Sequence, residues 1–113
     1  MSIHYLEIVT DDQESTCAVY ENSHGVTFSS EPLLGNARIA PMKNGGLIGV
    51  RLPMSDTEQP AVRPYHLVED IEKAYQMALD SGAQEAHSPL NIPGIGTFAI
   101  YEVGGNQLGL WQK

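Results

Sequence analysis

The 113-residue sequence is poor in basic residues, in cysteine and in long apolar runs, and each shortage disfavours a class of protein. Six Lys and Arg stand against fourteen Asp and Glu, a net charge of −8. No basic cluster supplies the phosphate contacts of a nucleic-acid-binding protein or of a protein bound to an anionic membrane. The single cysteine, Cys17, cannot form an intrachain disulfide, which is typical of a reducing compartment.

No apolar run approaches the roughly 20 residues of a membrane-spanning helix. The N-terminus also lacks the basic segment and apolar stretch of a secretory signal. We therefore expect a cytoplasmic protein with neither a membrane nor a nucleic acid as partner. The length predicts a single domain over residues 1–113.

The two halves of the sequence repeat one pattern. Asp12 and Asp70, 58 residues apart, each precede a segment with helical spacing of apolar residues, and Gly45 and Gly104 repeat with an offset of 59. The aspartates are predicted helix N-caps. The helices are predicted to end at the caps Gly25 and Gly82. In the first half, three further strands are predicted after the helix, at 25–30, 37–42 and 47–52. In the second half, the corresponding strands are predicted at 84–89, 96–103 and 106–112.

Each half is therefore predicted to be a βαβββ module, module one over 1–55 and module two over 60–113, with a linker at 53–62. The expected fold class is α+β: two βαβββ modules form a curved mixed β-sheet around a concave cleft, with the helices outside. A concave sheet surface favours binding of a small molecule.

This repeat resembles the vicinal oxygen chelate superfamily, which includes glyoxalase I, bleomycin resistance proteins and extradiol dioxygenases. The similar segments are "LEIVTDDQESTCAVY" in the first half, and "YHLVEDIEKAYQMALDSGAQ" and "NIPGIGTFAIYEVGGNQLGLWQ" in the second. The resemblance implies the fold above, a small-molecule ligand and a homodimer.

Enzymes of this superfamily generally hold a divalent metal with four residues, usually His and Glu, on the first and last strands of each half. Counting back seven residues from the helix caps places the first-strand slots at Tyr5 and Arg63. The last-strand slots fall at Val50 or Arg51 and at Gly109. Arginine stays protonated and glycine has no side chain, so neither ligates a metal. We therefore expect no metal and no other cofactor.

A slip of one residue would instead place His4 in the first slot. The first-strand slot of the second half would then be Val62, and the last-strand slots would be Gly49, Leu108 or Leu110. One histidine does not make a three- or four-ligand site, so a metal is not expected in this register either. Strand alternation groups His4 with Leu6 and Ile8, which are expected to pack under a helix.

The sheet face opposite the helices is the predicted ligand-binding surface, because aromatic walls with a few polar groups are typical of ligand pockets. Its predicted members are Tyr5, Glu7, Arg51, Arg63, Tyr65, Gln107 and Trp111. Arg63 suits a carboxylate or phosphate, and Glu7 is the candidate general base if the protein is catalytic. Alternatively, Arg63 and Glu7 pair with each other, or this face is a dimer interface.

Three functions remain open from the sequence. The preferred hypothesis is a glyoxalase-like protein that binds a small molecule without a metal. The alternatives are a metal-dependent lyase or dioxygenase of the glyoxalase type, and an interaction module whose concave face contacts a partner chain.

Overall fold

The computed structural model describes residues 1–113, which divide into two compact units. From here on, module one is the unit Tyr5–Val62, and module two is the unit made of Met1–His4 and Arg63–Lys113. The first residues of the chain belong to module two, where Leu67 N donates a hydrogen bond to Ser2 O at 2.9 Å.

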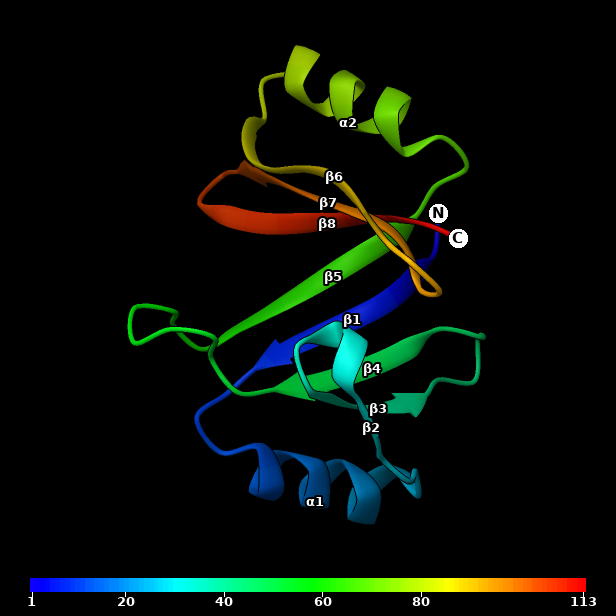
Figure 1. Ribbon diagram of the computed structural model, residues 1–113, viewed down its shortest axis with the longest axis vertical. Coiled ribbons are helices and arrows are strands. Elements are labelled where there is room, and N and C mark those ends of the chain that lie inside the picture. Colours follow the sequence, from blue (N-terminus) through cyan, green and yellow to red (C-terminus); the bar gives the residue numbers. More distant parts are fainter. The chain divides into compact units, whose positions relative to one another are not determined.

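Module one contains one helix, four strands and a single 3₁₀ turn (Figure 1). The elements are β1 (Ile3–Val9), α1 (Gln13–His24), β2 (Ser29–Glu31), the 3₁₀ turn η1 (Pro32–Leu34), β3 (Ala37–Pro41) and β4 (Leu47–Arg51). The strand order is β2-β3-β4-β1, and β4 runs parallel to β1 while the other pairs are antiparallel.

Helix α1 begins and ends where the sequence predicts. The Asp12 carboxylate accepts a hydrogen bond from Ser15 N at 3.0 Å, and Gly25 closes the helix with φ of 67°. Cys17, on the buried side of the helix, lies in one cluster with Ile8 and Val50. This cluster fixes the strand register, because Ile8 on the helix side puts Tyr5 and Glu7 on the opposite face.

Module two repeats the arrangement with longer strands (Figure 1). Its elements are β5 (Ala61–Leu67), α2 (Ile71–Asp80), β6 (Gln84–Ile92), β7 (Gly96–Val103) and β8 (Asn106–Gln112). The strand order is β5-β8-β7-β6, with β5 and β8 parallel and the other pairs antiparallel. Gly104 and Gly105, both with positive φ, form the two-residue turn between β7 and β8.

Helix α2 covers one face of the module-two strands. Asp70 caps its start by accepting from Lys73 N at 3.1 Å, and Tyr75 packs against Ala99 and other residues of the strands. The helix ends one residue earlier than predicted. Ser81 is the C-cap and Gly82, with φ of 111°, follows it, because the left-handed residue lies just beyond the cap.

The predicted α+β class with two βαβββ modules and a mixed sheet is confirmed. One strand is shorter than expected: the segment 25–30 contributes only the start of β2. Val26 and Phe28 pack against the core of module one, and Phe28 N donates to the Glu21 carboxylate at 3.2 Å instead of pairing with a strand.

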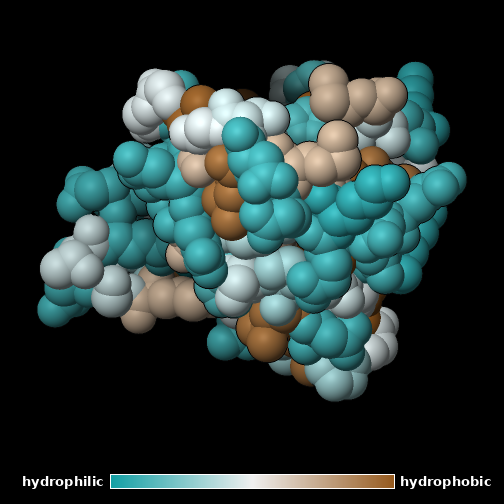
Figure 2. All heavy atoms as spheres, turned by 90° about the horizontal axis from the view of Figure 1, so that it is seen from above, coloured by the Kyte–Doolittle hydropathy of each residue, from teal (hydrophilic) through white to brown (hydrophobic).

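None of the helices is long and apolar enough to cross a membrane. The surface seen in Figure 2 is mostly hydrophilic, and its hydrophobic atoms lie in several separate patches. Single exposed apolar side chains such as Met77 on α2 are ordinary on a folded protein.

Candidate functional site

In each module, the sheet face opposite the helix carries predicted site residues; we call it the helix-free face. On module one, this face holds a buried ion pair. Arg51 Nε, at the end of β4, lies 2.8 Å from Glu7 Oε2 on β1. Arg51 is 5% exposed and Glu7 is 8% exposed, so the pair is largely removed from water. Buried charges of this kind are stable only when paired.

Arg51 also binds a second carboxylate, which sequence reasoning missed. Its Nη1 and Nη2 atoms donate to the two carboxylate oxygens of Glu58 at 2.8 and 2.7 Å. Glu58 Oε1 accepts from Met54 N as well, at 2.7 Å. Glu58 lies in the segment predicted as a linker, where no periodic pattern marks a side chain as buried or paired.

Two pKa values are shifted in this part of module one. The hydrogen bond to Glu58 raises the pKa of Arg51, so the guanidinium stays charged. Burial raises the pKa of the Tyr5 phenol well above its ordinary value, and the nearby charge of Glu7 adds to the shift. Tyr5 is therefore a neutral phenol at every physiological pH.

On module two, the helix-free face carries a row of polar side chains that crosses the four strands. Arg63 Nη2 donates to Gln107 Oε1 at 2.7 Å, and Gln107 Nε2 lies 3.5 Å from Glu102 Oε2. Glu102 stands opposite both Gln107 and Gln84 in the strand register. We call Arg63, Gln107, Glu102 and Gln84 the polar row.

Aromatic rings occupy the other end of the same face. Tyr65 and Trp111 meet edge to face at 5.9 Å between ring centroids, and Tyr65 and Phe98 do so at 6.3 Å. Phe98 also lies against His87 at 4.8 Å, and Trp111 against His4 at 5.5 Å. Phe98 and His87 were not predicted, although Phe98 pairs with Trp111 in the β7–β8 register.

A tyrosine ring covers a glycine of the last strand in each module. A Cβ atom built on Gly49 would overlap the phenol of Tyr5, and one on Gly109 would overlap the ring of Tyr65. The register also shows that Gly49, rather than Val50 or Arg51, is the counterpart of Gly109. Gly49 stands opposite Glu7, and Gly109 stands opposite Tyr65.

The residues at the expected metal slots do not fit a divalent metal. The first-strand residues are Tyr5, whose phenol is buried, and Arg63. The last-strand residues are Gly49 and Gly109, whose side-chain space is filled by tyrosine rings. His4, the ligand of the alternative register, lies instead against Trp111. No three His, Cys, Asp or Glu side chains are grouped so that they could hold a metal.

The structure therefore gathers the predicted ligand-binding residues into two groups. Module one brings together Tyr5, Glu7 and Arg51, and module two brings together Arg63, Tyr65, Gln107 and Trp111. The alternative pairing of Glu7 with Arg63 stays a prediction. Glu7 is bound by Arg51, and Arg63 is bound to Gln107.

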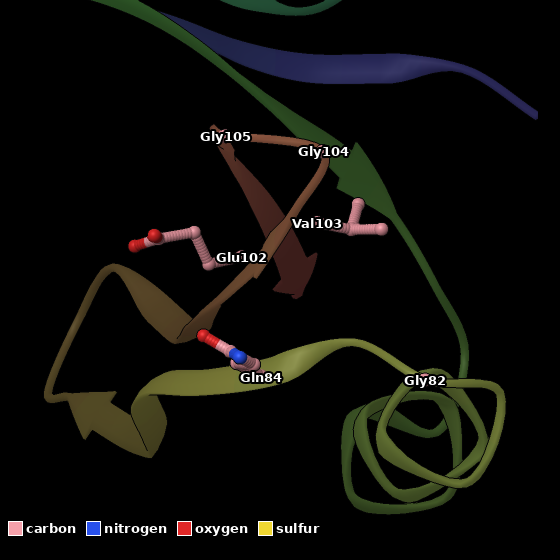
Figure 3. Close-up of a pocket in the computed structure, with 6 residues that line it drawn as sticks. All are labelled: Gly82, Gln84, Glu102, Val103, Gly104 and Gly105. Atoms are coloured by element: carbon pink, nitrogen blue, oxygen red, sulfur yellow. The ribbon is translucent and has the colours of Figure 1, made fainter.

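Pockets also occur away from these groups. A small open pocket of about 180 Å³ lies beside the β7–β8 turn (Figure 3). It is lined by Gly82, Gln84, Glu102, Val103, Gly104 and Gly105. Ligand pockets usually measure about 300–1,000 Å³, so this hollow alone is small for a ligand. Its lining nevertheless includes two members of the polar row.

A larger pocket of about 560 Å³ lies at the chain ends of module two. It is lined by Met1, Ser2, Leu67, Val68, Glu69, Gln112 and Lys113. A third, of about 360 Å³, lies beside Glu58 in module one. None of the predicted ligand-binding residues lines these three pockets.

Solved structures of similar fold cover nearly the whole chain. A hypothetical protein from Bacillus halodurans matches with a TM-score of 0.75 and 14% identity, over 99% of this chain and 94% of its own. Methylmalonyl-CoA epimerase from Mycobacterium tuberculosis matches with a TM-score of 0.73 and 12% identity, over 97% and 86%. No family model and no curated protein matches the sequence.

A third similar structure belongs to a named superfamily. A glyoxalase/bleomycin resistance protein/dioxygenase superfamily member from Vibrio splendidus matches with a TM-score of 0.70 and 14% identity, over 96% of this chain and 97% of its own. The chain thus has the vicinal oxygen chelate fold, and the resemblance predicted from the sequence is confirmed at the level of fold. The same fold can host unrelated activities, so function has to be argued from the side chains.

Proposed function

We propose that this protein binds a small molecule and does so without a metal ion. One observation carries the proposal: both last-strand glycines, Gly49 and Gly109, lie under a tyrosine ring of their own module. Side chains therefore fill the positions where metal-dependent relatives are expected to carry ligands. A metal-dependent lyase or dioxygenase would need those positions.

The remaining side chains of the helix-free faces support ligand binding. Module two combines one guanidinium and one amide with several aromatic rings, the mixture typical of small-molecule sites. Two of the structural neighbours are named for small molecules, an epimerase of methylmalonyl-CoA and a member of a superfamily named in part for bleomycin resistance. A homodimer is the expected assembly.

Metal analysis of the purified protein, combined with thermal unfolding, tests the proposal. We expect well under one equivalent of Ni, Zn, Fe or Mn, and no change in melting temperature on chelation. A panel of small acids, amines and neutral aromatic compounds should contain stabilising ligands. A ligand at 100 times its Kd adds about 2.7 kcal/mol of stability.

Two results would overturn the proposal. One equivalent of metal, lost together with an activity on chelation, would indicate the glyoxalase-type enzyme. An absence of any stabilising compound, with a change in oligomeric state when Trp111 is replaced, would indicate that this face contacts a partner chain.

A further inference from the structure

We draw no further inference here: the strongest candidate, the pocket of about 560 Å³ at the chain ends of module two, is lined by exposed and half-buried side chains only, and nothing in the structure shows what would fill it.

Discussion

The two modules share a backbone plan but differ in what their helix-free faces carry. Each module packs a helix on one sheet face and a tyrosine over a last-strand glycine on the other. Module one fills the rest of that face with a network of one arginine and two glutamates. Module two fills it with aromatic rings and a single arginine bound to an amide.

The arginines of the two modules have different partners. The arginine of module one is bound by two carboxylates, and one of them ties the segment after β4 to the sheet. This network is suited to fixing structure. The arginine of module two donates to the Gln107 amide, and aromatic rings lie further along the same face.

The largest expected effect is on the network of module one. Arg51→Leu removes the guanidinium that binds the buried carboxylate of Glu7 and the carboxylate of Glu58, and should lower the free energy of unfolding by about 3–5 kcal/mol. Urea unfolding measures the change. The exposed Lys43 provides the control, since Lys43→Ala removes a positive charge from the same module and should cost no more than about 0.5 kcal/mol. A loss below 1 kcal/mol for Arg51→Leu would show that the network contributes little.

A smaller effect is expected where tyrosine covers glycine, and it should differ between the modules. At Gly109 an added methyl group meets the base of the Tyr65 ring, which cannot swing away, whereas at Gly49 it meets mainly the far end of Tyr5. Gly109→Ala should therefore destabilise by about 1–3 kcal/mol, and Gly49→Ala by less.

A double-mutant cycle checks the origin of this cost. In a Gly109→Ala background, Tyr65→Ala should cost less than it does in the wild-type protein, because it removes the overlap. Additive costs of the two substitutions would mean that the overlap does not cause the destabilisation.

The smallest expected effect is a slight loss of stability at acidic pH, and it depends on His4 in module two. Burial lowers the pKa of His4 below its ordinary value of 6.5, and the charge of Lys113 adds to this. A group with a lowered folded-state pKa stabilises above its unfolded pKa and loses that contribution as the pH falls. The melting temperature should therefore drop slightly below pH 6.5, and His4→Phe should remove that part of the decline.

An NMR titration of the His4 ring is the direct measurement, and it should give a midpoint below 6.5. A midpoint above that value would mean that the ring is stabilised in its charged form, and would contradict the lowering of its pKa by burial.

Much of the fold was predictable because it depends on short-range patterns. Asp12 and Asp70 cap their helices as expected, and the apolar spacing of Ile71 and Tyr75 marks the buried side of α2. The alternation in β1 correctly placed Ile8 against the helix and thus Tyr5 on the other face. These features follow from backbone geometry within a few residues.

Other features depend on residues far apart in the chain. Glu58 lies in an irregular segment, and only folding brings it to Arg51. The assignment of Gly49 as the counterpart of Gly109 required the pairing of β1 with β4, and local counting missed it by one or two residues. Phe98 joined the aromatic group through cross-strand pairing.

By itself, the sequence determined that the chain builds two βαβββ modules and which side of each element faces a helix, because residue periodicity encodes both. It also determined that Tyr5 and Arg63 stand on the first strands of the two halves. Only the tertiary structure decided what those residues contact. The covering of Gly49 and Gly109 by tyrosines and the binding of Arg51 by two carboxylates are set by strand pairing and loop packing, which local patterns do not encode.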